Sequence, residues 1–327
     1  MKCIDIDKTM GSEPQLRLIE HARPEPQIGQ ALIKVAYAGV NRPDILQRRG
    51  LYPPPHGASP IIGLEVSGTI ESLSLAPDQS CGFKLGDEVC ALVNGGGYAQ
   101  YVAVDIGQIL PIPKGLGLKE AASLPEVAIT VTANLLEHGA YQSGEKVLIH
   151  GANSGISSFA IQLAAALGAK VYATARGELK CAYAKSLGAD KVIDTQKDDF
   201  AEILQSDQGA DVILDIVGGD YVARNIMALA FRGRLVQIGV PKGDTVEISL
   251  RHIMRKQAII TGSMLRPRSS AEKTRLCDLV LQRVWPLIEV GLIHTHIEQV
   301  FDFKDAQAAH DYLDQGTHLG KVVLKIH

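Results

Sequence analysis

Small residues between an apolar run and a helix give the chain a candidate phosphate-binding turn. The run that begins at Val147 leads into the turn GANSGIS (151–157), and a helix and a second apolar run follow. Glycines in such a turn let the backbone approach a pyrophosphate, and the free N–H groups that open the helix face the anion. We therefore expect a bound dinucleotide. Its expected contacts in the turn are Asn153, Ser154, Gly155, Ile156 and Ser157.

Ser157 is the irregular position of this turn, because the dinucleotide fingerprint usually ends on a glycine there. That last glycine mainly allows the helix to pack closely on the strand, so we expect a serine to weaken binding without abolishing it. The serine hydroxyl could also donate to a phosphate oxygen. The alternative is a small-residue turn that holds no ligand.

The end of the second apolar run indicates which dinucleotide binds. Sites for NAD usually carry an acid there, which accepts from the ribose 2′-OH and repels a 2′-phosphate. This chain has Ala175, then Arg176, with Lys180 one turn into the next helix. Two cations without an acid favour NADPH. The alternative is that both are ordinary solvated charges.

Two kinds of sequence pattern predict two domains. Over about the first 120 residues, short β-type runs alternate with Gly, Pro and Asp turns, which is typical of a mainly antiparallel sheet. The proline-rich segment 51–60 is expected as a loop at a surface or a cleft. Further on, apolar strands alternate with helices, which predicts an α/β, doubly wound parallel sheet. Those strands are expected at 146–151, 170–175, 191–194, 211–217, 234–240 and 258–263.

The C-terminal part is expected to return and complete the first domain. Residues 266–291 have the pattern of one long helix, and β-type runs follow at 297–303 and 320–327. The chain contains no internal repeat and no low-complexity tract.

Composition narrows the compartment and the partners. The chain has 327 residues, 46% of them hydrophobic, and a net charge of −3, which gives no electrostatic reason to expect nucleic acid or an anionic membrane. Five scattered cysteines without a CxxC pair indicate a reducing compartment, and neither a secretory leader nor a long apolar span is evident. We expect a cytoplasmic protein that acts on small molecules.

Several longer motifs resemble one family. They are AGVNRPDILQRRGLYPPPHGASPIIGLEVSGTI (38–70), GGGYAQYV (95–102), AASLPEVAITV (121–131), GSMLRPRS (262–269) and LGKVVLKI (319–326). Together they resemble the zinc-free quinone oxidoreductase branch of the medium-chain dehydrogenase/reductase superfamily, nearest its stress-inducible, tumour-suppressor-regulated subgroup and more distantly zeta-crystallin. The resemblance implies a GroES-like substrate domain (1–121 and 267–327), a Rossmann-type NADPH-binding domain (122–266) and a homodimer.

The same resemblance implies that no metal takes part. Zinc-dependent relatives carry a cysteine soon after AGV and a His–Glu pair in the GxExxG motif, whereas Asn41 and Leu64 stand at these ligand positions here. Neither residue type rebuilds a tetrahedral zinc site. The pair His294 and His296 is expected at the surface rather than as a metal site.

By resemblance, Asn41 and Tyr52 flank the nicotinamide and the substrate, with the Asn41 amide donating to an oxyanion and Tyr52 orienting or protonating the acceptor. Quinones and electron-poor enones suit a metal-free site, because their carbonyl systems are already electrophilic and the anion formed is delocalised. The alternatives are structural: Asn41 as a turn residue before Pro43, and Tyr52 as a ring packed on the prolines.

The resemblance also implies cofactor contacts outside the turn. They are Thr130, Gly239, Leu265, Arg266, Gly320 and Lys321. For Thr130 the alternative is a hydroxyl bonded back along its own helix. Two departures remove contacts that many relatives make with the 2′-phosphate: Thr195 replaces a tyrosine, and residues 175–177 replace the motif AGS. A bidentate contact from Arg176 could compensate.

Three functions stay open at this point. The leading hypothesis is an NADPH:quinone oxidoreductase, and an NADPH-dependent enone or enal reductase would use the same residues. The third is a non-catalytic NADPH-binding protein, structural or RNA-contacting, although no basic patch interleaved with aromatic residues supports RNA binding. A hydrolase is excluded, because the chain has no GxSxG motif.

Overall fold

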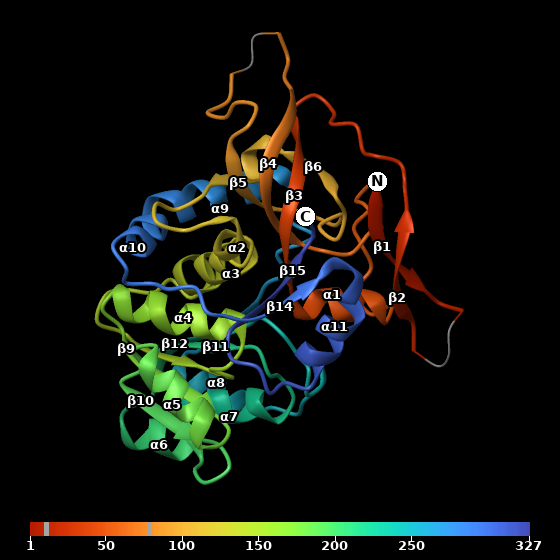
Figure 1. Ribbon diagram of the computed structural model, residues 1–327. Helices are drawn as coiled ribbons and strands as arrows, with labels where there is room; N and C mark the ends of the chain where they lie inside the picture. Colours follow the sequence, from red (N-terminus) through yellow and green to blue (C-terminus); the bar gives the residue numbers. More distant parts are fainter. Residues whose placement is uncertain (10–12, 78–79) are drawn as a thin grey trace. The chain divides into compact units, whose positions relative to one another are not determined.

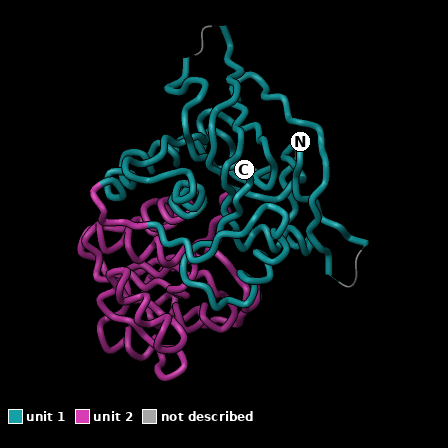
Figure 2. Tube along the Cα trace, in the orientation of Figure 1, with its two compact units in different colours: residues 1–129, 266–289, 295–327 teal, residues 130–265, 290–294 magenta. Residues whose placement is uncertain are grey.

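The computed structural model describes residues 1–9, 13–77 and 80–327, which fold into two compact units (Figure 2). Unit 1 comprises the described residues of 1–129, 266–289 and 295–327, and unit 2 comprises 130–265 and 290–294. The sequence places domain boundaries after residues 121 and 266, and the compact units change over after residues 129 and 265.

Unit 2 is built on a six-stranded parallel sheet, as predicted. The strands are β8 (Lys146–Ile149), β9 (Lys170–Ala175), β10 (Lys191–Asp194), β11 (Ala210–Asp215), β12 (Leu229–Gln237) and β13 (Ile259–Gly262). They lie in the order β10-β9-β8-β11-β12-β13. Figure 1 labels β9, β10, β11 and β12 of this sheet. The direction in which strands are added reverses between β8 and β11. In open parallel sheets, ligands bind at the carboxyl ends of the strands beside such a reversal.

Apolar side chains bury the strands of this sheet on both faces. Val147 and Leu148 of β8 and Val212 and Ile213 of β11 are all 0% exposed, as a parallel sheet covered by helices requires. The connecting helices are α4 (Gly155–Ala166), α5 (Glu178–Ser186), α6 (Phe200–Ser206), α7 (Asp220–Ala228) and α8 (Leu250–Lys256). β12 begins at Leu229 rather than at the predicted residue 234. Its first residue pairs with β11 before a register shift, and an alternating sequence pattern does not predict such a shift.

Unit 1 is built on a mainly antiparallel sheet, also as predicted. Its strands are β3 (Gln30–Val40), β4 (Glu65–Ser74), β5 (Glu88–Leu92), β6 (Tyr101–Asp105), β7 (Ile109–Pro111), β14 (Ile297–Asp302) and β15 (Lys321–Lys325). The order is β14-β15-β3-β4-β5-β7, and β6 pairs with β3. Val322 of β15 lies opposite Val40 of β3, so the C-terminal tail completes this sheet. β1 (Lys2–Asp7) and β2 (Gln15–Glu20) form a separate two-stranded sheet.

The α-helices of unit 1 range from 4 residues in α2 to 14 residues in α9. They are α1 (Arg42–Arg48), α2 (Leu118–Ala121), α9 (Ser270–Arg283), α10 (Trp285–Glu289) and α11 (Ala306–Asp314). α3 (Pro125–Val131) spans the change between the units and continues into the π-helix η2 (Thr132–His138). Residues 51–60 contain no strand. Within the described residues, no helix combines the length and the apolar character needed to cross a membrane.

The prediction of one long helix over 266–291 is wrong, because the segment divides into α9 and α10. Ser269 caps the start of α9 by accepting from the N–H of Glu272. The helix ends at Arg283, and its C-cap Val284 has a φ of −113°, far from the usual helical value of about −63°. Pro286 lies just beyond and cannot donate a backbone hydrogen bond to the preceding turn, which separates the two helices.

β3 and β4 approach each other so closely that β4 needs a glycine at residue 68. A Cβ at Gly68 would lie 2.0 Å from the carbonyl oxygen of Lys34 on β3. Backbone cannot retreat there without breaking the ladder between the two strands.

Gly68→Ala is therefore expected to lower the free energy of unfolding by about 3 kcal/mol through overpacking. Denaturant unfolding measures this loss. Gly82→Ala is the matched control, because a Cβ there would meet no atom within 4 Å. Equal stability of the two variants would contradict the close approach of β3 and β4.

Candidate functional site

The predicted phosphate turn lies between the end of β8 and the start of α4. Gly151 has a φ of +69°, and a Cβ there would lie 3.1 Å from Ile216 Cδ1, so this position favours glycine. Ser154 caps α4, because its Oγ accepts from the N–H of Ser157 at 3.1 Å. Within the described chain, the N–H groups of Gly155 and Ile156 have no acceptor. These donors at a helix N-terminus fit a phosphate group.

The Ser157 hydroxyl serves the contact between helix and strand. Ser157 is 0% exposed, and its Oγ donates to the carbonyl oxygen of His150 at 2.6 Å and accepts from the Ser154 hydroxyl at 3.0 Å. The Ser157 hydroxyl therefore donates its proton to a backbone carbonyl and not to a phosphate oxygen. Serine fills the position where a glycine would bring α4 closer to β8.

His150 joins the carboxyl ends of three neighbouring strands beneath this turn. Its Nδ1 lies 2.9 Å from Thr174 Oγ1 on β9, and its Nε2 donates to Asn225 Oδ1 at 2.7 Å. Asn225 in turn donates to Asp215 Oδ2 on β11 at 2.8 Å. Burial lowers the pKa of His150, so the ring is held neutral. The network fixes the strand ends from which the phosphate turn starts.

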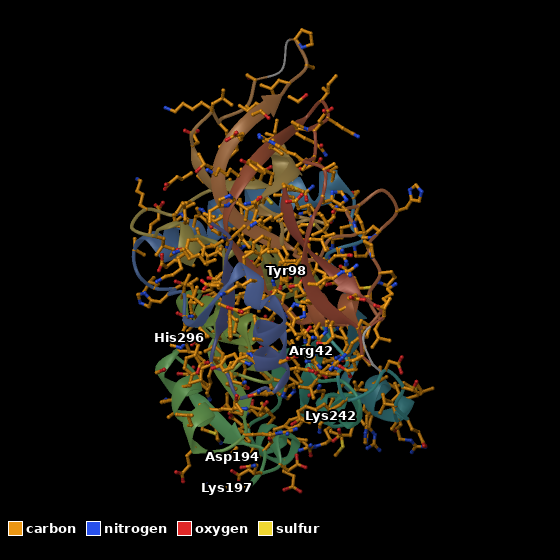
Figure 3. The ribbon with its side chains drawn as sticks, turned by 45° about the vertical axis from the view of Figure 1, so that its right-hand side comes forward. Arg42, Tyr98, Asp194, Lys197, Lys242 and His296 are labelled. Atoms are coloured by element: carbon orange, nitrogen blue, oxygen red, sulfur yellow. The ribbon has the colours of Figure 1, made fainter. Side chains whose placement is uncertain are left out.

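The turn after β9 presents one free cation beside an acid that sequence reasoning missed. Arg176 is exposed, and within the described chain its guanidinium has no hydrogen-bond or ion-pair partner. The N–H of Gly177 donates to Asp194 Oδ1 at 3.0 Å, and this contact and that from the N–H of Gln196 lower the pKa of Asp194. Lys197 lies 3.8 Å from the same carboxylate (Figure 3). Asp194 therefore adds a negative charge next to the turn, and Lys197 offsets it.

The other predicted contacts in unit 2 lie at element ends. Thr130 is 7% exposed, and its carbonyl accepts from Asn134 Nδ2 at 2.8 Å. Gly239 follows β12, and a Cβ there would lie 3.3 Å from the carbonyl oxygen of Ile216. Leu265 follows β13, and Lys180 lies in the first turn of α5. Their roles toward a cofactor stay predictions.

Asn41, Glu65 and Lys321 form a buried cluster in unit 1. Lys321 Nζ donates to Asn41 Oδ1 at 2.7 Å and to Glu65 Oε1, and Asn41 Nδ2 donates to the same carboxylate oxygen at 2.9 Å. The side chains of Lys321 and Glu65 are 7% and 0% exposed. This geometry uses the amide oxygen of Asn41 and one of its two N–H groups, which leaves one N–H for an oxyanion.

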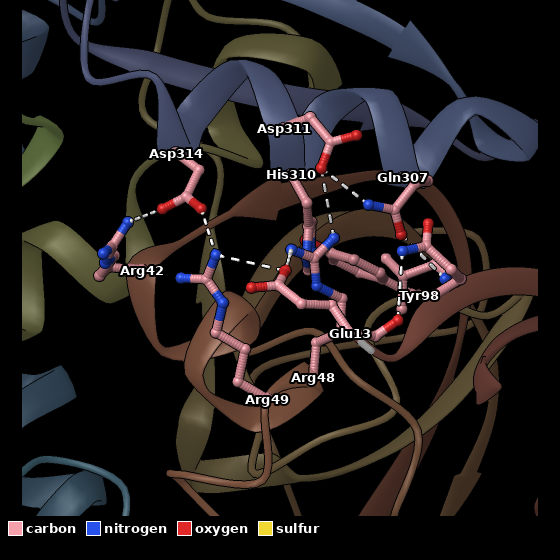
Figure 4. Close-up of polar contacts among 11 residues, drawn as sticks. Glu13, Arg42, Arg48, Arg49, Tyr98, Gln307, His310, Asp311 and Asp314 are labelled. Carbon is pink, nitrogen blue, oxygen red and sulfur yellow. Dashed lines mark hydrogen bonds and ion pairs between the residues drawn. The ribbon is translucent and has the colours of Figure 1, made fainter. Parts of the chain in front are cut away.

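Helix α11 fixes the helix that Asn41 precedes. Asn41 is the N-cap of α1, and Arg48 and Arg49 lie in the last turn of α1 and directly after it. Arg48 donates to Asp311 at 3.4 Å, and Arg49 donates to Asp314 (Figure 4). These contacts hold α1, which begins directly after Asn41, against α11.

The donors of this cluster do not fit zinc. Leu64 is 2% exposed and has no ligand atom, and the Asn41 oxygen already accepts from the Lys321 ammonium. Among the residues that the structure describes, no group of three or more His, Cys, Asp or Glu side chains is arranged to hold a metal ion. His294 and His296 are both exposed, as expected for surface residues.

Arg266 contacts both the backbone and the ring of Tyr52. It is 5% exposed, and its guanidinium donates to the carbonyl oxygen of Asn94 at 2.7 and 3.0 Å and to that of Tyr52 at 3.3 Å. Its Cζ lies 5.5 Å from the centre of the Tyr52 ring. Lys273, which is 0% exposed, donates to the Arg266 carbonyl at 2.7 Å. Arg266 is a predicted cofactor contact, but these N–H groups already donate to carbonyl oxygens within unit 1.

The structure brings the predicted site residues together in separate groups. Asn41 lies with Lys321, and Tyr52 with Arg266, in unit 1. Gly320, next to Lys321, has a φ of +81°. The phosphate turn and the β9 turn belong to unit 2. Sequence reasoning missed His150, Lys273 and Glu126. For Glu126 a signal existed, since it is a lone acid in the apolar stretch SLPEVAITV.

Comparison with known proteins identifies relatives along the whole chain. Residues 27–114 match the alcohol dehydrogenase GroES-like domain family, and residues 155–282 match the zinc-binding dehydrogenase family. The chain is 30% identical over 308 residues to the quinone oxidoreductase of Mus musculus, which covers 92% of this chain and 90% of that protein. It is 31% identical over 315 residues to a phenolphthiocerol/phthiocerol polyketide synthase of Mycobacterium tuberculosis. That match covers 95% of this chain, but only 14% of the synthase.

Solved structures with the same fold agree with these matches. The quinone oxidoreductase from Thermus thermophilus, also solved in complex with NADPH, is 30% identical, with a TM-score of 0.84 and 100% of both chains covered. The CurK enoyl reductase is 26% identical, with a TM-score of 0.84 and 99% of both chains covered. The predicted GroES-like and Rossmann-type fold is confirmed. The chain belongs to the quinone oxidoreductase branch of the medium-chain dehydrogenase/reductase superfamily.

Proposed function

We propose that the protein is an NADPH-dependent oxidoreductase that reduces quinones. The observation that carries this proposal is the pairing of a phosphate cradle at the start of α4 with an unpaired Arg176, rather than an acid, after β9. An arginine suits a 2′-phosphate, and NADPH is the cofactor named for the Thermus thermophilus relative. The turn residues 153–157, Arg176 and Lys180 would hold NADPH, together with Thr130, Gly239, Leu265, Gly320 and Lys321.

The proposed chemistry needs hydrogen-bond donors and no Lewis acid. NADPH supplies a hydride when bound, and a quinone is electrophilic enough to accept it. The free N–H of Asn41 is suited to the developing oxyanion. Burial, and then the nearby Glu126, raise the pKa of Tyr52, so its phenol keeps its proton and acts as a donor. These two side chains would orient the acceptor.

A second candidate is the reduction of conjugated enones, enals or enoyl thioesters. It is favoured by the likeness to CurK enoyl reductase and to a polyketide synthase of which this chain spans 14%. The same cradle and the same donors serve this reaction, because its intermediate is also a delocalised enolate anion.

An acceptor profile tests both candidates. Purified protein is titrated with NADPH and with NADH by nicotinamide fluorescence, and then given 1,4-benzoquinone, 9,10-phenanthrenequinone, a simple enone or an enoyl thioester. NADPH-selective binding with fast oxidation by the quinones supports the first candidate, and fast oxidation by the enone or thioester alone supports the second. Selective binding without turnover on any acceptor leaves a non-catalytic NADPH-binding protein.

We further propose a homodimer that forms through β13. This strand ends the sheet of unit 2, and Ile259 and Ile260 on it are 55% and 39% exposed. An unpaired edge with exposed apolar side chains is a template for pairing with another strand, and a second copy of β13 offers the same surface. The cytoplasmic location stays a prediction from the cysteine pattern.

Arg176→Gln is expected to weaken NADPH binding about tenfold and to leave NADH binding unchanged. The reason is the loss of a charge-assisted contact with the 2′-phosphate worth about 1.4 kcal/mol. Fluorescence titration with both nucleotides measures the ratio, and Arg251→Gln on α8 is the exposed control. An unchanged NADPH-to-NADH ratio in Arg176→Gln would show that Arg176 is an ordinary solvated charge.

Ile259→Lys is expected to convert the dimer to monomer, because it places charges at the apolar edge. Light scattering coupled to size-exclusion chromatography measures the mass. Leu85→Lys, at a residue that is 62% exposed on unit 1, is the control and should stay dimeric. A monomeric wild-type protein, or an Ile259→Lys variant that is still dimeric, would contradict the proposed interface through β13.

A further inference from the structure

Three carboxyl groups gather in unit 1 around the Asn41 cluster, and only one of them is accessible. Asp44 and Glu65 are both 0% exposed. Asp44 accepts from the N–H groups of Asn41 at 2.7 Å and Gly63 at 3.2 Å, and Glu65 is bound by Asn41 and Lys321. Glu126 is only half-buried, and its carboxyl has no hydrogen-bond partner within the described residues. This carboxyl is therefore the one that is free to reach a ligand.

The position of Glu126 is fixed by its backbone. Pro125 and Glu126 begin α3, and the N–H of Glu126 donates to Glu65 Oε2 at 2.9 Å. Glu126 is thereby tied to the same carboxylate that holds Asn41 and Lys321. The backbone of Glu126 thus shares the Glu65 carboxylate with Asn41, which is one of the two residues proposed to orient the acceptor.

Charged groups from several elements face Glu126. Glu65 on β4 and Asp44 on α1 disfavour its ionised form, whereas Lys321 on β15 and Lys273 on α9 favour it. Burial outweighs both cations and, with Glu65, raises the pKa of Glu126 to about 8. The carboxyl is therefore protonated at neutral pH. It also interacts electrostatically with Tyr52 and with Arg266.

We propose that Glu126 is a catalytic acid that protonates the anion left by hydride transfer. This inference rests on the proposed function. Hydride adds two electrons and one proton to a quinone and gives the hydroquinone monoanion. The O–H bond of Glu126 then breaks, a new O–H bond forms on the phenolate oxygen, and water reprotonates the carboxylate. With an enone, the same proton goes to the α-carbon of the enolate.

Glu126 suits this role better than its neighbours. General acids work best when their pKa lies near the working pH. Asp44 is fully enclosed by protein donors and cannot reach a ligand. The Tyr52 phenol is a weaker acid still than a free phenol, because its pKa is raised. Glu65 is bound by Lys321 and Asn41, whereas the Glu126 carboxyl has no protein partner within the described residues, so the two carboxyl groups lie in different environments, as expected where one of them acts as an acid.

Kinetics of Glu126→Gln test the proton transfer. The variant is expected to bind NADPH as the wild type does but to turn over about 100-fold more slowly, because it offers no acidic proton. The wild-type kcat/KM should fall as the pH rises through about 8, where Glu126 loses its proton, and Glu126→Gln should lack this alkaline limb. Glu88→Gln, at an exposed position on β5, is the matched control.

Chemical rescue separates a proton donor from a positioning residue. Added acetate or formate should restore part of the activity of Glu126→Ala, because a small acid fits where the side chain was removed. Wild-type activity in Glu126→Gln, an alkaline limb that persists in it, or the absence of rescue would each overturn the proposal.

A measurement without cofactor or acceptor keeps the result separate from the proposed function. Glu126 has a pKa of about 8 in the folded protein against an ordinary 4.5, so the folded state binds its proton more tightly. The stability it contributes is fully present below pH 4.5 and is lost as the pH rises to about 8. Melting temperatures from pH 5 to 8.5 should fall less steeply in Glu126→Gln than in the wild type or Glu88→Gln.

The two sets of results distinguish the failures. If Glu126→Gln flattens the melting curve but no acceptor oxidises NADPH, then the proposed function has failed and Glu126 still holds its proton. If turnover occurs and the melting curves of wild type and Glu126→Gln are parallel, then Glu126 is not protonated and this inference is overturned.

Discussion

The buried ion pair between Lys321 and Glu65 is the contact on which unit 1 most depends. It joins the C-terminal strand β15 to β4 and holds the Asn41 amide between them. β3 accommodates it only because a Cβ is missing at Gly39, where it would lie 2.1 Å from Glu65 Oε1. Removing one partner of such a pair leaves a charge buried without compensation, at a cost of about 3–5 kcal/mol. The tail is thus both the last strand of the sheet and part of the candidate site.

In unit 2 the strand ends that carry the phosphate turn are held in place by neutral hydrogen bonds to His150 rather than by an ion pair with it. The carboxyl ends of β8, β9 and β11 are joined by neutral His150, with Thr174 on one side and Asn225 and Asp215 on the other. Because these polar groups satisfy one another in a buried network, they hold the strand ends in one arrangement. Ser157 takes part by bonding to the His150 carbonyl, which explains how the turn keeps its form without its usual last glycine.

An ammonium group at the centre of the unit 1 cluster limits the chemistry available there. Lys321 offers a fixed positive charge and hydrogen bonds, but unlike a metal ion it has no coordination position for an oxygen. Acceptors that are already electrophilic match these means, and a protonated carboxyl beside the cluster would complete the reduction. Quinones and conjugated carbonyls are both electrophilic, and both need a proton after hydride transfer. Which of the two classes the protein prefers therefore depends on the shape of the acceptor site.

Patterns along the chain determined the parallel sheet, the glycine turn at 151–157 and the missing acid after Ala175, because strand periodicity and turn geometry depend on neighbours in sequence. They did not reveal the division of α9 from α10, or that the Ser157 and Arg266 donors are spent within the protein. The pKa of Glu126 is raised first by burial and then by Glu65, a residue that is remote from it in sequence. Only the tertiary structure decided these points, since desolvation and hydrogen-bond partners are set by groups that meet in space.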